Sequence, residues 1–213
     1  MQNILDMLKE SGAILEGHFK LSSGKHSDKY IQCASVLKNP KNAEILGQEI
    51  AKKLPENIDL VVSPAMGGVI IGHEVAKALG VEFIFTERDE NGQMILKRNF
   101  NIEKNAKVAI IEDVITTGKS TKEVIDLVEK NYGIINSLGC IVNRGNIEEI
   151  KDVGVNYLLS INPKIYTPEE CPLCKNGVDI TKPGSRKIWH LYFLLSFLYY
   201  YTDRIKLQKI LIY

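Results

Sequence analysis

Apolar and polar positions along the chain change between two periodicities and predict alternating strands and helices. Short apolar runs bounded by turn residues predict strands at residues 59–63, 81–86, 107–113, 134–142 and 155–161. Apolar residues at helical spacing predict helices at 67–79 and 118–130, and another that begins at Asn39-Pro40, a cap followed by a first-turn proline. This alternation indicates an α/β fold, a parallel sheet flanked by helices with right-handed crossovers.

Three stretches depart from the alternation. Residues 2–10 predict a short helix that Gly12 can end, and residues 17–33 mix short β-like pieces with turn formers. Residues 87–106 are polar and are expected to form a loop. We therefore expect one domain over residues 1–186, with a small N-terminal part, mainly 1–35, placed before the sheet.

The last part of the chain has a different composition. Residues 187–213 contain half of the aromatic residues and the apolar run IWHLYFLLSFLYYY at 188–201. That run is too short to span a bilayer comfortably, so we do not expect a membrane protein. Two interpretations stay open: a segment that binds a membrane surface or a partner, or an aromatic-rich extension unrelated to the core chemistry.

Charge and cysteine content exclude some classes of protein. The overall net charge is +1, and residues 187–213 supply +3 of it, so residues 1–186 carry −2. Such a body is not expected to bind the phosphate backbone of nucleic acids. The N-terminal residues MQNILDMLKE have no uninterrupted apolar run, so no signal peptide is expected, and the spacing of the four cysteines implies no disulfide framework. A cytoplasmic location is therefore expected.

The segment VAIIEDVITTGKS at 108–120 is the main candidate site. An apolar strand delivers Glu112 and Asp113 to a short turn, and a helix follows near Gly118. Ligands of parallel α/β sheets bind at the carboxyl ends of strands, and the free N–H groups of a helix start favour a phosphate. The hydroxyls of Thr116, Thr117 and Ser120 add donors.

The paired acids restrict the kind of ligand that this site can bind. Two carboxylates repel a bare anion, but they bind sugar hydroxyls and can support a Mg²⁺ ion. A ribose 5-phosphate satisfies both demands, with its phosphate at the helix start and its 2- and 3-hydroxyls on Glu112 and Asp113. The letters GKST at 118–121 do not complete a P-loop, because the required earlier glycine is replaced by Asp113.

EDVITTGKS resembles the phosphoribosyl-diphosphate signature of type I phosphoribosyltransferases, and other segments resemble the orotate branch of that family. HFKLSSGKHSDKY (18–30) is similar to the N-terminal hood that closes over the base. SPAMGGVIIG (63–72) is similar to the loop that holds diphosphate, and VNRG (142–145) to an orotate-binding segment. The resemblance covers roughly residues 1–186.

The resemblance implies a set of site residues. Phosphoribosyl diphosphate would be bound by Glu112, Asp113, Val114, Ile115, Thr116, Thr117, Gly118, Lys119, Ser120, Ala65, Met66 and Gly67. Orotate would be held by Thr116 and Arg144 and covered by Tyr30. A guanidinium suits this role because orotate carries a carboxylate, which Arg144 can bind in a bidentate fork.

The resemblance also implies a catalytic lid and a homodimer, since in the family the lid reaches the neighbouring subunit's site. Here the corresponding stretch, 86–100, is shorter and has no histidine, so Arg88, Lys97 and Arg98 are the available cations beside the catalytic acids Glu112 and Asp113. In the hood, Ser22 stands where many orotate enzymes have lysine; nearby Lys20 or Lys25 can substitute.

Cys171 and Cys174 are a weak indication of zinc, because a structural site needs four ligands and the sequence shows no second pair or suitable histidine nearby. A tight turn with two thiols is the preferred interpretation, with a site shared between subunits as the alternative.

The resulting hypothesis is Mg²⁺-dependent transfer of 5-phosphoribosyl to orotate in pyrimidine (UMP) biosynthesis. The alternatives are a purine phosphoribosyltransferase and a non-catalytic regulator that binds phosphoribosyl diphosphate.

Overall fold

The computed structural model describes residues 3–21 and 23–183. The chain divides into two units, Met1–Ile180 and Thr181–Tyr213, and all elements described below belong to the first. The predicted domain boundary at 186, the aromatic extension and Ser22 lie outside the described residues. None of the described helices is long and apolar enough to cross a membrane.

The larger sheet of the described part has seven strands in the order β5-β4-β3-β6-β7-β9-β8. Its inner strands run parallel, and β5 and β8 join the two edges antiparallel. The strands are β3 (Leu60–Pro64), β4 (Glu82–Arg88), β5 (Met94–Leu96), β6 (Lys107–Ile115), β7 (Ile134–Asn143), β8 (Glu149–Ile150) and β9 (Val153–Ser160). The predicted α/β class with a mainly parallel sheet is therefore confirmed.

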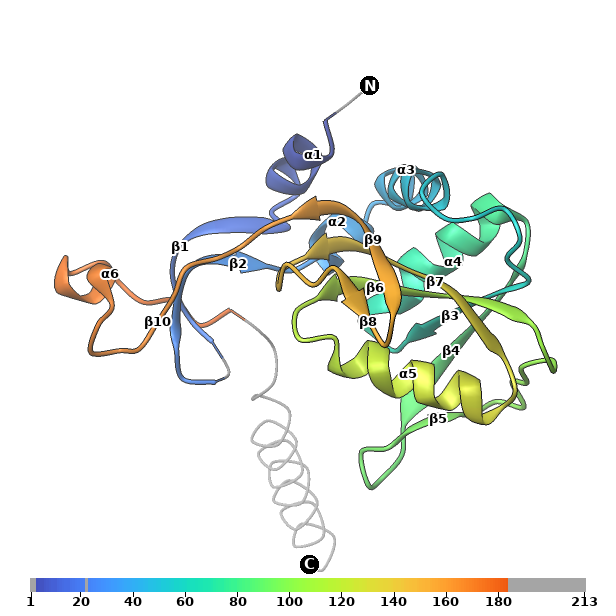
Figure 1. Ribbon diagram of the computed structural model, residues 1–213. Coiled ribbons are helices and arrows are strands. Elements are labelled where there is room, and N and C mark those ends of the chain that lie inside the picture. The colour runs from blue at the N-terminus through green and yellow to red at the C-terminus, as the bar shows by residue number, and fades with distance from the viewer. Residues whose placement is uncertain (1–2, 22, 184–213) are drawn as a thin grey trace, which may run out of the picture. The chain divides into compact units, whose positions relative to one another are not determined.

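Helices cover both faces of this sheet: α3 (Pro40–Ala51) and α4 (Gly67–Leu79) on one, and α5 (Lys119–Lys130) on the other (Figure 1). Successive side chains of a strand point to opposite faces. Accordingly, Ala109 and Ile111 of β6 pack with α3 and α4, whereas Val108 and Ile110 pack with α5. The sheet is thus buried on both sides, and β6 lies in its interior.

The predicted start of α3 is confirmed in detail. Asn39 caps the helix, its side-chain oxygen accepting a hydrogen bond from the Lys41 backbone N–H at 3.0 Å, and Pro40 occupies the first turn. A side-chain cap of this kind satisfies a backbone donor that the helix itself leaves unpaired.

A small three-stranded sheet, the hood, stands beside the larger one in the order β1-β2-β10. Its strands are β1 (Ile14–Lys20), β2 (His26–Ile31) and β10 (Ile165–Tyr166), and the short helices around it are α1 (Ile4–Glu10), α2 (Ala34–Leu37) and α6 (Pro172–Lys175). The hood therefore includes a strand from the C-terminal part of the domain, which the sequence pattern did not indicate.

Two local predictions are corrected. The stretch 87–106, expected to be a loop, contains β5, which pairs with β4 and buries Met94. The strand predicted to stop at residue 113 continues to Ile115, so Glu112 and Asp113 lie before its end and not at its end, and their side chains point to opposite faces of the sheet.

Candidate active site

The junction between β6 and α5 consists of a strand end, a short turn and a helix start, in the order that the sequence predicted. β6 ends at Ile115, residues 116–118 form the turn, and α5 begins at Lys119. Gly118 adopts a left-handed φ of 68°, and a Cβ there would lie 2.7 Å from Ile150 Cδ1. Only glycine fits such a position without strain, which explains the residue at this turn.

A cavity of about 150 Å³ opens at this junction. It is lined by Glu112, Val114, Ile115, Thr116, Thr117, Gly118, Lys119, Ser120 and Thr121. The structure therefore brings together eight of the nine residues that the sequence analysis assigned to the phosphoribosyl group at this segment. The ninth, Asp113, faces the other side of the strand.

Asp113 lies against the start of α4. A Cβ built on Gly67 would be 2.5 Å from Asp113 Oδ1, so the carboxylate touches the Gly67 backbone, and Oδ1 accepts a hydrogen bond from the Val114 N–H at 2.8 Å. The loop Ala65–Gly67 is thus at the same edge of the sheet as the two acids. In this loop the Ala65–Met66 peptide bond is cis and the Met66 side chain is exposed.

Both acids are shifted toward their protonated forms. Burial, reinforced by the neighbouring charge of Asp113, raises the pKa of Glu112 to about 8. Burial also raises the pKa of Asp113. Carboxylates in such a position are stabilised by a cation or by hydroxyl donors, which is what a sugar and a Mg²⁺ ion provide. The oxygen ligands at this edge therefore fit a hard cation.

Arg144 is held beside the cavity by its own backbone. Its N–H donates to the Ile115 carbonyl at 2.8 Å, and the next residue, Gly145, sits directly against the Thr116 carbonyl, where a Cβ would clash. The guanidinium is half-buried, and within the described residues it has no hydrogen-bonding or ion-pairing side chain. Burial lowers the pKa of Arg144, while the interaction with Tyr30 opposes that shift.

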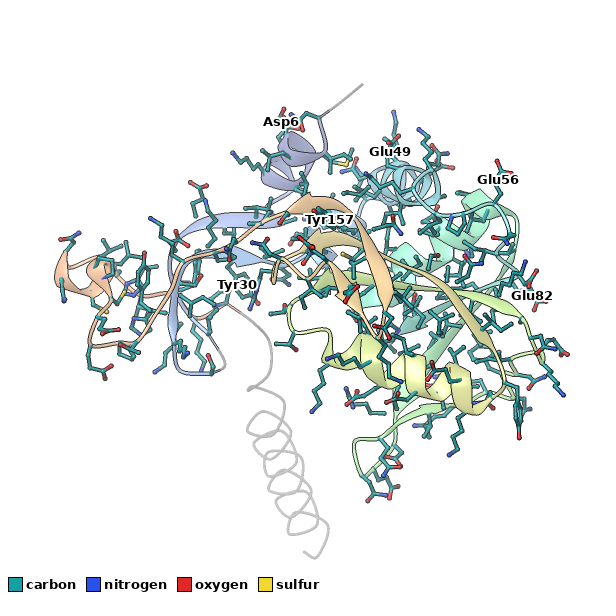
Figure 2. All side chains as sticks on the ribbon, in the orientation of Figure 1. Asp6, Tyr30, Glu49, Glu56, Glu82 and Tyr157 are labelled. Carbon is teal, nitrogen blue, oxygen red and sulfur yellow. The ribbon has the colours of Figure 1, made fainter. Side chains whose placement is uncertain are left out.

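Tyr30 extends from β2 of the hood (Figure 2) and packs against Phe19, with ring centroids 5.8 Å apart. At the end of the same segment, the Cys33 thiol donates to the Asp113 carbonyl at 3.8 Å. The hood is therefore connected to β6 next to the acids, and Tyr30 lies within electrostatic reach of Arg144.

The three proposed lid cations do not line the cavity of their own chain. Arg88 pairs with Glu123 and donates to the Gly92 carbonyl at 2.6 Å, and Arg98 Nε lies 3.0 Å from Glu87 Oε2. Lys97 Nζ donates to the Arg88 carbonyl at 3.2 Å. These contacts hold them around the β4–β5 hairpin and the side of α5, and none of the three lines the cavity at residues 112–121.

One group of side chains was missed by the sequence analysis. His18 and His26 of the hood lie beside Cys171 and Cys174, so the statement that no suitable histidine is near the cysteine pair was wrong. The histidines and the cysteines are more than 140 positions apart along the chain, so no local sequence pattern could indicate that they meet.

Comparisons with known proteins identify the family of this chain. A model of the phosphoribosyl transferase domain family matches residues 34–168. The orotate phosphoribosyltransferase of Desulforamulus reducens is 44% identical over 188 residues, covering 88% of this chain and 98% of that protein. The Thermotoga maritima protein of the same name is 45% identical over 184 residues, covering 86% and 98%.

Solved structures show the same fold. The crystal structure of orotate phosphoribosyltransferase from Aeropyrum pernix superimposes with a TM-score of 0.65 at 23% identity, covering 74% of this chain and 93% of that one. An adenine phosphoribosyltransferase from Thermoanaerobacter pseudethanolicus gives 0.53 at 22% identity, covering 62% and 88%. At this level of identity the likeness concerns the fold alone. By its domain match and by its sequence relatives, the chain belongs to the phosphoribosyl transferase domain family and, within it, to the orotate phosphoribosyltransferases.

Proposed function

We propose that the enzyme transfers the 5-phosphoribosyl group of 5-phosphoribosyl 1-diphosphate to orotate, giving orotidine 5′-phosphate and diphosphate in pyrimidine biosynthesis. The observation that carries the choice of orotate is the half-buried Arg144 guanidinium, which lies next to the acid-flanked cavity and has no carboxylate partner within the described residues. A substrate carboxylate would complete it with a charge-assisted, bidentate hydrogen bond.

The 5-phosphate would occupy the cavity at the β6–α5 junction. The backbone N–H groups at the start of α5 are unpaired within the helix, and the hydroxyls of Thr116, Thr117 and Ser120 line the same space. Lys119 adds a positive charge there. The positive end of the helix dipole favours a dianion at this position.

The ribose would lie between the two acids and the loop at Ala65–Gly67. Glu112 borders the phosphate cavity and Asp113 contacts Gly67, so the 2- and 3-hydroxyls would meet carboxylates on both sides of the strand end. The diphosphate would be bound by the N–H groups of Met66 and Gly67, because the N–H of Ala65, the third residue expected here, already donates to the Thr86 carbonyl at 2.9 Å. Mg²⁺ would enter with the sugar diphosphate. Glu112 and Asp113 are the residues that would hold it, through bridging water, and its charge would stabilise the leaving diphosphate.

Catalysis would rest on alignment and electrostatics. The C1–O bond breaks with its electron pair leaving on diphosphate, and a ring nitrogen of orotate forms the new bond to C1. The proton of that ring N–H passes to the leaving diphosphate or to water, so atoms and charge balance. Asp113 and Glu112 would fix the sugar and favour the positive charge that develops on it.

The lid cations would act from a second subunit. Arg88, Lys97 and Arg98 lie at the β4–β5 edge and not at the cavity of their own chain, which supports a homodimer in which each edge serves the neighbouring site. We further propose a cytoplasmic location, which suits the four free thiols of the chain.

The test of the reaction is spectroscopic. The full chain is mixed with phosphoribosyl diphosphate, Mg²⁺ and orotate, and the loss of orotate absorbance is followed; parallel reactions contain adenine or xanthine. We expect turnover in the reaction that contains orotate and none in the reactions that contain adenine or xanthine. Turnover with a purine base and none with orotate would contradict the assignment.

The shared site is tested by mixing two inactive chains. In a dimer that combines an Asp113→Asn chain with a Lys97→Ala/Arg98→Ala chain, one site receives an intact acid and an intact lid. Random re-assortment should then restore about a quarter of wild-type activity. If the lid serves its own chain, mixing restores nothing.

A further inference from the structure

Four potential metal ligands converge at the tip of the hood. They are His18 near the end of β1, His26 at the start of β2, Cys171 at the cap of α6 and Cys174 within α6. Their ligand atoms all lie within 4.8 Å of one another, and His18, His26 and Cys171 are buried. Figure 1 shows α6 on the hood side of the molecule, next to the β1–β2 hairpin.

Four of the six separations among these ligand atoms are close to the edges of a tetrahedron around one ion, and the other two are at most 4.8 Å. His18 Nε2 lies 3.0 Å from His26 Nδ1, 3.5 Å from Cys171 Sγ and 3.6 Å from Cys174 Sγ, and His26 Nδ1 lies 3.3 Å from Cys174 Sγ. With the usual zinc–nitrogen and zinc–sulfur bond lengths, a tetrahedral site has N···N edges of about 3.3 Å and N···S edges of about 3.6 Å.

The hydrogen bond behind His18 selects the tautomer that a metal needs. His18 Nδ1 lies 2.8 Å from the Val178 carbonyl oxygen, which can only accept, so Nδ1 carries the proton. The lone pair is therefore on Nε2, the atom that faces the cluster. Metal-binding histidines are commonly oriented by such a bond from their other ring nitrogen.

Hydrogen bonds alone do not account for this arrangement. In that tautomer His18 Nε2 has one lone pair, yet three heteroatoms approach it within 3.6 Å. One of them can donate to it, and the other two would be left close to it without a bond. A cation at the centre would bind all four ligand atoms at once and so account for the four short distances between them.

We propose that His18 Nε2, His26 Nδ1, Cys171 Sγ and Cys174 Sγ bind one Zn²⁺ ion in a tetrahedral structural site. Two thiolates and two imidazoles in this geometry favour zinc over calcium or magnesium, which prefer oxygen ligands. All four positions are filled by protein, so the ion has no open position for catalysis. The site is distinct from the Glu112–Asp113 edge.

The ion fastens the C-terminal segment to the hood. β10 pairs with β2 through Ile165 and Tyr166 only, and the buried side chains at this end of the described hood include the polar His18, His26 and Ser27. An apolar core is thus small where the two segments meet, and a metal supplies the missing cross-link. Zinc binding should therefore order β2, the strand that carries Tyr30.

The test begins with metal analysis of the full chain, produced without a histidine tag and purified under reducing conditions. We expect about one zinc per chain, and replacement by Co²⁺ should give the visible absorption of a tetrahedral thiolate site. The Cys174→Ser variant, altered at the exposed thiol, should lose most of the zinc. His73→Ala, which removes an exposed histidine outside the cluster, and Cys140→Ala, which removes another thiol, should retain it.

Two results would overturn the proposal: substoichiometric zinc after reconstitution with Zn²⁺ and reductant, or a Cys171–Cys174 disulfide in metal-free protein that is as stable to heat as the reconstituted chain. Both readouts, metal content and melting temperature, are independent of catalysis. They can therefore fail or succeed whatever the outcome of the orotate assay, and they need no variant that might not fold.

Discussion

The contact between Gly67 and Asp113 allows a sharp test of the sugar-binding role of that acid. Gly67 is the first residue of α4 and does not have a left-handed φ, so alanine suits its backbone and should stabilise the helix by up to about 1 kcal/mol. The added Cβ, however, would lie 2.5 Å from Asp113 Oδ1 and 2.9 Å from its Cγ. Ordinary contacts are near 3.5 Å, so the carboxylate must move by about 1 Å.

That movement also weakens the hydrogen bond from the Val114 N–H, worth about 1 kcal/mol, so the net change in the free energy of unfolding should be close to zero. The effect on turnover should be much larger, since a misplacement of 1 Å at a reacting group can lower the rate about 100-fold. Gly67→Ala should therefore keep its melting temperature and lose most of its kcat/KM for both substrates.

The assay is steady-state loss of orotate absorbance, combined with thermal unfolding of the same preparation. Gly154→Ala is the matched control, because a Cβ at Gly154 meets no atom within 4 Å and should leave both measurements unchanged. If Gly67→Ala unfolds like the wild type and retains near-normal kcat/KM, then the position of the Asp113 carboxylate does not matter for catalysis and the reasoning is wrong.

Three further predictions concern the charged groups of the site. Arg144→Ala should raise KM for orotate at least tenfold and change KM for phosphoribosyl diphosphate little, because the lost charge-assisted bond contributes about 1.5–3 kcal/mol; equal losses for both substrates in initial-rate kinetics would remove the assignment. Asp113→Asn should reduce kcat while the circular dichroism spectrum and melting temperature stay as in the wild type, and a normal kcat would contradict its role. Because the pKa of Glu112 is raised from 4.5 to about 8, the folded state keeps a proton that the unfolded chain loses, so stability should fall between these pH values, by at most about 1.4 kcal/mol per pH unit. In urea titrations, the free energy of unfolding of Glu112→Gln should rise relative to that of the wild type as the pH increases across that window. If the two free energies change with pH in parallel, the raised pKa is not present.

The region around residues 107–120 could be predicted because its information is local. A strand, two acids, a turn with Gly118 and a helix start follow one another within a few residues, and each step has its own physical signature. The meeting of Arg144 with this turn also follows from fold class, since β6 and β7 are parallel neighbours whose carboxyl ends lie at the same edge.

Features that depend on distant contacts could not be predicted in this way. β5 has three residues, and its strand structure comes from pairing with β4 and not from a pattern of its own. β10 and α6 meet the hood across more than 130 positions of sequence, so His18 and Cys171 carry no sign of each other. The opposite facing of Glu112 and Asp113 was missed because the strand was expected to end at residue 113, so the two acids were treated as its last residues and not as part of its regular alternation.

The backbone bond between Arg144 and Ile115, together with the close packing of Gly145 on Thr116, ties two loops of the sheet edge into one rigid piece. In the proposed binding mode, the base and the sugar phosphate lie on either side of these joined loops. The distance between the reacting atoms is therefore set by the main chain, and side-chain rotamers do not change it. A bicyclic base would have to find its extra room toward Tyr30, and evolution of a new nucleobase preference would then act through the hood while leaving the sugar pocket untouched.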